Sequence, residues 1–124
     1  MKKKECNFED GFIKGEVVRK KLNGKGTFYY FNGEILEGNF KDDELCGFGQ
    51  SISLDNKCRF QGEYYEGKKN GRGIFYYDDG SYEFAFYEDH QIVGEVLLID
   101  NNGNAYIRYQ QENLTLGAPL NFVL

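Results

Sequence analysis

Residues 24–46 read GKGTFYYFNGEILEGNFKDDELC, and this unit decides the fold because its landmarks return along the chain. Gly24 recurs as Gly47, Gly71, Gly94 and Gly117, at spacings of 23, 24, 23 and 23 residues. A second set of landmarks, the turn signals that end at Gly33, Asn56, Gly80 and Gly103, keeps the same period. Self-similarity at a fixed period indicates one supersecondary unit that is repeated and stacked.

Each unit is expected to be a β-hairpin. Residues 27–30 are β-branched or aromatic, which favours a strand. Asn32-Gly33 follows, and this pair predicts a type I′ turn because both residues tolerate positive φ. Residues 34–40 then form the returning strand, and residues 41–44 form a polar linker loop. No segment has the apolar spacing of a sustained helix, and the only helical candidate is a short one at residues 110–116.

The units resemble the MORN repeat, whose pattern is roughly G-x-G-x-x-x-Y-x-D/N-G-x-x-Y-E-G-x-W/F. The match is carried by these residues: Gly24, Gly26, Tyr30, Asn32, Gly33, Leu36, Glu37, Gly38 and Phe40 in one unit, and Gly71, Gly73, Tyr77, Asp79 and Gly80 in another. The resemblance covers roughly residues 10–109. It implies an all-β fold, a single elongated and twisted antiparallel sheet of stacked hairpins.

The length of 124 residues predicts one domain over residues 1–124. Its units begin near Gly24, Gly47, Gly71 and Gly94, with one partial unit before Gly24 and another from Gly117. The pattern weakens toward the C-terminus, as is usual for repeats that cap an array. We therefore expect residues 117–124 to form a C-terminal capping strand, with Pro119 at its opening, where a missing N–H matters least.

Charge is distributed unevenly along the chain. The net charge is −5, but residues 1–30 carry eight Lys or Arg against four acids, whereas residues 78–124 carry one Arg against eight acids. One interpretation is a solvated surface of drifting composition, and the other is head-to-tail self-association of opposite ends. Three cysteines without CxxC spacing, no secretory signal and no membrane-length apolar run predict a cytoplasmic protein.

The residues do not suggest catalysis. His90 is the only histidine and lies in a polar loop, while the carboxylates at 42–44 and 78–79 occupy linker and turn positions. Gly-x-Gly opens strands here, so it is not a phosphate loop. No cluster has metal-ligand spacing, and the acidic chain is a poor match for nucleic acid. We therefore expect a non-enzyme with no cofactor and no metal.

Strand alternation predicts two rows of apolar side chains, one on each face of the sheet. One row includes Phe28, Tyr30, Phe75 and Tyr77, and the other includes Tyr29, Tyr76 and Ile99. Large apolar patches on a single-layer sheet mark interaction sites, so these seven residues are the predicted partner-binding positions. Cover of the second row by the twist of the sheet or by the tail is the competing explanation.

These features favour a non-catalytic scaffold or adaptor that docks a helix or an extended segment of a protein partner. The family resemblance implies association with cytoskeletal or ciliary assemblies. It also implies two alternatives, a regulatory subunit of an enzyme on another chain and a phospholipid- or phosphoinositide-binding membrane tether. The basic residues available for weak contact with an anionic lipid surface are Lys2, Lys3, Lys4, Lys20, Lys21 and Lys25.

Overall fold

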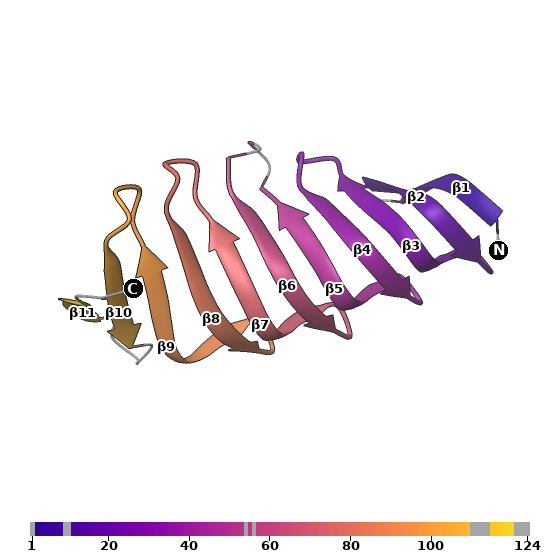
Figure 1. Ribbon diagram of the computed structural model, residues 1–124. Coiled ribbons are helices and arrows are strands. Elements are labelled where there is room, and N and C mark those ends of the chain that lie inside the picture. Colours follow the sequence, from indigo (N-terminus) through magenta and orange to yellow (C-terminus); the bar gives the residue numbers. More distant parts are fainter. Residues whose placement is uncertain (1, 9–10, 54, 56, 110–114, 121–124) are drawn as a thin grey trace.

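The computed structural model describes residues 2–8, 11–53, 55, 57–109 and 115–120, and every regular element within them is a β-strand. The strands form one antiparallel sheet in which each strand pairs with its neighbours in the sequence (Figure 1). They are β1 (Lys2–Phe8), β2 (Gly11–Val18), β3 (Lys21–Tyr30), β4 (Ile35–Lys41), β5 (Glu44–Ile52), β6 (Arg59–Tyr65), β7 (Lys68–Tyr76), β8 (Tyr82–Glu88), β9 (Gln91–Ile99), β10 (Ala105–Tyr109) and β11 (Thr115–Leu120). The predicted all-β sheet of stacked hairpins is confirmed, and β1 is an additional strand that the repeat pattern did not predict.

The tightest turns join consecutive repeats, which corrects the prediction of a type I′ turn at Asn32-Gly33. Only Gly33 of that pair has positive φ, and the connection from Tyr30 to Ile35 is a four-residue loop. The Asn32 side chain accepts the Glu34 N–H at 2.9 Å, which holds an Asx turn instead. The two-residue turn with positive φ at both positions lies in the linker, at Asp42 (48°) and Asp43 (70°).

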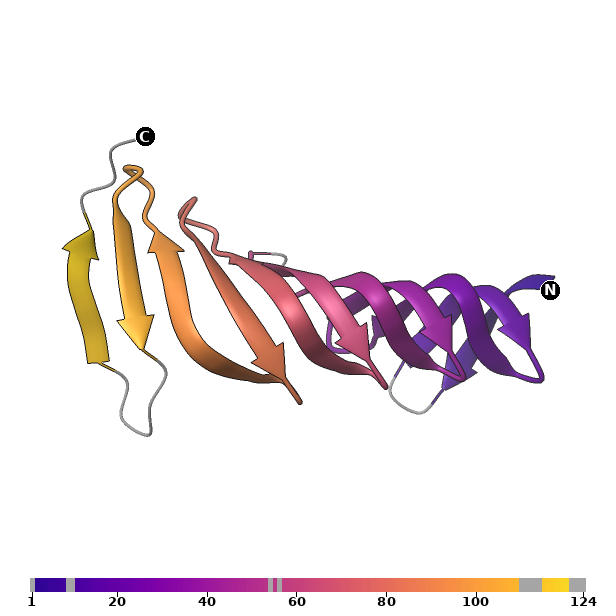
Figure 2. The same cartoon turned by 60° about the horizontal axis from the view of Figure 1, so that its bottom comes forward.

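A row of small residues crosses the middle of the sheet. Consecutive cross-strand partners are Gly15, Gly26, Gly38, Gly49, Gly62, Gly73 and Ala85. The strands curve along their length (Figure 2). Phe60 and Tyr64 flank Gly62 on one face, and their ring centroids are 5.8 Å apart. In a straight strand, residues four apart are separated by about 13 Å, so these rings lean toward each other across the glycine.

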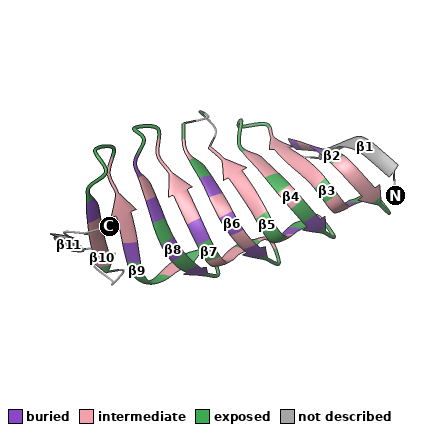
Figure 3. Ribbon diagram, viewed as in Figure 1, coloured by how far each residue is buried: buried purple, intermediate pink, exposed green. Residues whose placement is uncertain are grey.

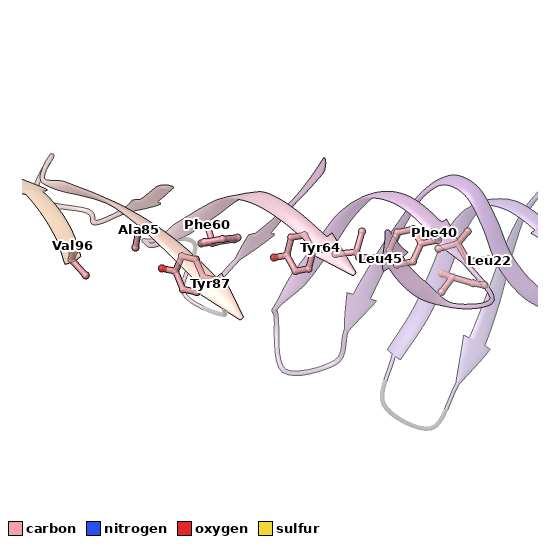
Figure 4. Packing of buried hydrophobic residues seen from close by; sticks show 9 residues of the cluster. Leu22, Phe40, Leu45, Phe60, Tyr64, Ala85, Tyr87 and Val96 are labelled. Atoms are coloured by element: carbon pink, nitrogen blue, oxygen red, sulfur yellow. The ribbon is translucent and has the colours of Figure 1, made fainter. Parts of the chain in front are cut away.

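The space above the small-residue row holds the core of the protein. We call this side of the sheet the core face, and its buried cluster runs as a line from repeat to repeat (Figures 3 and 4). The cluster consists of Ile13, Leu22, Phe40, Leu45, Phe60, Tyr64, Ala85, Tyr87 and Val96. A Cβ atom on Gly73 would overlap the tip of the Phe60 ring, and one on Gly26 would come within 2.5 Å of the Leu22 side chain. The missing side chains thus provide the volume that the core residues fill.

β11 is the last strand at the C-terminal end of the sheet, and it pairs antiparallel with β10. This strand is the predicted cap, but it begins at Thr115 rather than at Gly117. Pro119 therefore lies near its end, opposite Tyr106, and not at its opening. β11 has a neighbour on one side only, so the missing N–H of proline is tolerated there. Residues 121–124 of the predicted strand, and residues 110–114 of the short helical candidate, lie outside the described residues.

Candidate interaction groove

The face opposite the core carries exposed aromatic side chains. In β8 the two faces alternate strictly, because Glu83, Ala85 and Tyr87 are buried whereas Phe84 and Phe86 are exposed. The alternation follows from the two-residue period of a strand. We call this second side of the sheet the groove face.

A groove of about 1270 Å³ lies on the groove face between β4 and β10. Its central row joins cross-strand partners in consecutive strands, and the row changes from polar to apolar along the sheet. In order from β4 to β10, the row consists of Glu37, Gln50, Gln61, Ile74, Phe84, Leu97 and Ile107. The C-terminal half of the groove is therefore an apolar surface.

Exposed apolar side chains gather at this groove. Phe48, Phe84, Phe86 and Val93 line it, and they are 66%, 42%, 59% and 44% exposed. They make up half of the eight large hydrophobic residues that are exposed in the described part of the chain. Phe84, Phe86 and Val93 are neighbours on β8 and β9, where Phe86 and Val93 are cross-strand partners, whereas Phe48 lies on β5. Exposed apolar residues scattered singly are ordinary, but a contiguous group such as the one on β8 and β9 marks an interaction site.

The N-terminal half of the groove carries a chain of side-chain hydrogen bonds. Gln61 Nε2 donates to Gln50 Oε1 at 3.2 Å, and Gln50 Nε2 donates to Glu37 Oε1 at 2.7 Å. A second hollow of about 810 Å³ adjoins the groove at Glu37 and includes Lys25 and Tyr29. This end of the groove face is polar and mixed in charge.

One ion pair lies on the groove face, and its basic partner, Arg72, lines the groove. Glu63 and Arg72 approach to 3.4 Å, and Glu63 also accepts the backbone N–H of Arg72 at 2.5 Å. The backbone hydrogen bond, followed by the hydrogen bond from the guanidinium, holds the pKa of Glu63 below its usual value. Arg72 is thereby engaged with an acid of the neighbouring strand.

The core face holds charged side chains of its own. Lys69 occupies the repeat position of Leu22 and Leu45, and its Nζ lies 4.5 Å from the centroid of the Phe60 ring. Burial lowers the pKa of Lys69. Glu83 is paired with Arg108 at 2.9 Å. The described residues contain no group of three or more His, Cys, Asp or Glu side chains that could hold a metal ion.

The seven predicted partner-binding residues are divided between the two faces, and none of them lines the large groove. Phe28 and Phe75 pack against the core cluster, and Tyr30 and Tyr77 lie beside them at ring distances of 4.6 and 5.0 Å. Tyr29, Tyr76 and Ile99 lie on the groove face next to the groove. Tyr29 stacks on Phe12 at 4.8 Å, Tyr76 contacts Tyr82 at 6.1 Å, and Ile99 is the cross-strand partner of Tyr82.

The predicted lipid-contact residues do not form one described cluster. Lys20 and Lys21 are exposed at the turn between β2 and β3, whereas Lys25 is exposed on the groove face. Lys2, Lys3 and Lys4 lie in β1, and their side chains are outside the described residues. Within the described chain there is no helix that is long and apolar enough to cross a membrane.

Sequence reasoning missed the residues that line the large groove. Ile74 lies two residues before Tyr76, and Leu97 lies two residues before Ile99, so strand alternation places each pair on the same face. The sequence pattern therefore contained these two groove residues. Phe84 and Phe86 were available from the alternation in residues 82–88. Whether they are exposed depends on which face of the sheet the core side chains cover, and the strand pattern alone does not decide that.

Comparison with known proteins identifies the repeat. A family model described as MORN repeat matches residues 14–35, 37–53 and 60–82, which together make up half of the chain. No curated protein matches the sequence.

Proposed function

The chain belongs to the MORN-repeat family, and from this we propose that it is a non-catalytic protein-binding scaffold or adaptor whose partner docks in the groove. MORN repeats occur in repeat proteins that bind proteins or membranes. The choice of a protein partner, the absence of catalysis and the docking site are our proposal.

The observation that carries the proposal is the concentration of exposed Phe48, Phe84, Phe86 and Val93 along a groove of about 1270 Å³. Aromatic side chains dominate the energetics of most protein interfaces, and an exposed group of this kind gains free energy when a partner removes it from water. The polar row from Glu37 to Gln61 adds directional contacts at one end of the groove.

Lipid binding is the alternative, and the charge around the groove disfavours an anionic membrane. Residues 78–109 carry seven Asp or Glu and a single basic residue, Arg108, which is paired with Glu83. An anionic surface attracts basic segments, at about 1 kcal/mol for each Lys or Arg. Most of the apolar half of the groove, β8 to β10, lies in this acidic part of the chain, and Arg72 of β7 is paired with Glu63, so a protein segment is the better match.

Paired phenylalanine variants test the proposal. We expect full-length chain to capture a protein from its native source, and the purified partner to bind in calorimetry. Phe86→Ala in the groove should weaken that binding at least about tenfold, because an aromatic hot spot contributes 2 kcal/mol or more. Phe31→Ala is the control, since Phe31 is an exposed phenylalanine in the loop between β3 and β4 and does not line the groove.

Equal loss of affinity in the two variants, or no loss in either, would place the binding site elsewhere. Vesicles containing anionic phospholipid serve as the lipid arm of the same experiment. Strong vesicle binding without any captured protein would favour the membrane-tethering alternative instead.

A further inference from the structure

We propose that the segment that docks in the groove is a basic amphipathic α-helix, with its apolar side on the C-terminal half of the groove. This inference rests on the proposed function and adds the chemical class of the partner. Two observations carry it, the hydrogen-bonding state of the groove surface and the charge around it.

The groove surface offers almost no backbone hydrogen bonds to a ligand. β4 to β10 are each paired on both sides, so their N–H and C=O groups are used within the sheet. An extended segment lying across Ile74, Phe84 and Leu97 would bury its own backbone polar groups without partners, which is costly. A helix satisfies its backbone hydrogen bonds internally and presents only side chains. The surface therefore favours a helix.

The dimensions agree with a helix of ordinary length. The groove crosses the sheet from β4 to β10, which at about 4.8 Å between strands is about 29 Å. A helix of about 19 residues has that length, and its apolar half needs to contact only β7 to β10.

The charge around the apolar half of the groove indicates the sign of the charge that the partner carries. Glu95 is exposed and lines the groove. Exposed acids also lie at both ends of the strands that form this half, Asp78 and Asp79 before β8, Glu88 at the end of β8 and Asp89 in the turn between β8 and β9. The basic residues of β7 to β10 offset this charge only in part. Arg72 lines the groove but is paired with Glu63, and Arg108 is on the core face and is paired with Glu83. Lys69 lies beside Phe60 on the core face, and Lys68 is exposed at the start of β7. Lys or Arg flanking the apolar side of a docked helix would meet complementary charge on both sides.

Three labelled peptides of about 18 residues probe this inference. The first consists of leucine and lysine, with leucine at the spacing of one helical face. The second replaces every lysine by glutamate. The third keeps leucine and lysine in equal number but alternates them, which favours an amphipathic strand. Fluorescence anisotropy measures their binding to the full-length chain.

We expect the leucine–lysine helix to bind at least about tenfold more tightly than either of the other peptides. Phe86→Ala should weaken that binding at least about tenfold, and Phe31→Ala should leave it unchanged. Glu95→Gln should weaken it about threefold at about 0.1 M salt, with a smaller effect at about 0.5 M salt. Glu34→Gln is the charge control, because Glu34 is an exposed acid in the β3–β4 loop outside the groove.

Equal affinity for the lysine and glutamate helices would overturn the inferred charge, and tighter binding of the alternating peptide would overturn the inferred helix. If no peptide binds while Phe86→Ala still weakens the native partner, this inference is wrong and the proposed function stands. If Phe86→Ala affects neither a peptide nor the native partner, both are wrong.

Discussion

At the scale of single residues, two ion pairs in the described part of the chain differ in how far they are buried. The Glu83 and Arg108 side chains are only 5% and 18% exposed and approach to 2.9 Å, whereas Arg72, which pairs with Glu63, is 70% exposed. The buried pair also affects its surroundings. Burial, followed by the charge of Glu83, raises the pKa of Tyr77 and of Tyr87 to about 12.

Removing one partner of the buried pair should be strongly destabilising. Arg108→Ala leaves the Glu83 carboxylate buried without its counterion, at a cost of about 3–5 kcal/mol in the free energy of unfolding. Arg72→Ala is the matched control, and it should cost less than about 1 kcal/mol because the pair it breaks is exposed. Urea unfolding measures both. Similar losses in the two variants would contradict a special role for the buried pair.

His90 joins two neighbouring repeats through its backbone N–H and its imidazole Nδ1. Its backbone N–H donates to the Lys69 carbonyl at 3.0 Å, and its Nδ1 accepts the Lys69 backbone N–H at 3.2 Å. The second bond requires a neutral imidazole. Burial, and then the charges of Lys69 and Lys68, lower the pKa of His90 below 6.5.

This contact predicts a pH-dependent contribution to stability. Because the pKa of His90 is lower in the folded state, the unfolded chain takes up the proton first as pH falls. The stabilisation is fully present above pH 6.5 and is lost as pH falls through the pKa of the folded state. Thermal unfolding at about pH 7.5 and about pH 5.5 measures the change. His90→Asn keeps an acceptor that does not titrate, so an unchanged pH response in this variant would exclude His90 as the source.

At the scale of elements, the hairpin repeat uses two kinds of turn and one row of small residues. The two-residue linker turns also bind the preceding repeat, since the Asp43 N–H donates to the Leu22 carbonyl and the Gly67 N–H to the Leu45 carbonyl, each at 3.0 Å. The glycines let side chains of neighbouring strands fill the space above them. Each repeat is thus fixed to the next by backbone contacts on one edge and by packing in the middle.

Replacing a glycine of the small-residue row should reduce stability mainly because the new side chain overlaps its neighbours, and less because of backbone strain. In Gly73→Ala the new Cβ overlaps the buried Phe60 ring, which cannot move without disturbing the core, so we expect a loss of about 3 kcal/mol. Gly47→Ala is the control. Its Cβ meets nothing within 4 Å, and only the strain of a φ of 86° remains, at about 1 kcal/mol. Equal losses in chemical unfolding would argue against packing as the reason for Gly73.

At the scale of the whole molecule, the sheet is open and has two edges, β1 and β11. An open edge presents unpaired backbone groups that can pair with another chain. β11 covers β10, so the array ends on a strand that contains a proline.

Deletion of residues 115–124 should therefore lower stability and cause association through the uncovered edge of β10. Deletion of residues 121–124 is the control, because it retains every residue of β11. Light scattering coupled to size-exclusion chromatography gives the oligomeric state, and thermal unfolding gives the stability. If the chain that lacks residues 115–124 stays monomeric and equally stable, β11 is not a cap.

The sequence by itself determined the fold class and the order of the strands. The recurrence of Gly24 at Gly47, Gly71 and Gly94 identifies the repeat, and strands that follow each other in a meander pair in chain order because their connections are short. Tertiary structure decided the turn types, the inclusion of β1 and the face that is buried. Strand alternation assigns residues to two faces of the sheet, but it does not say which of the two faces is buried. The burial of Tyr87 and the exposure of Phe86 follow from side chains of successive repeats meeting over the small-residue row, which is a contact between strands and not a property of any one strand.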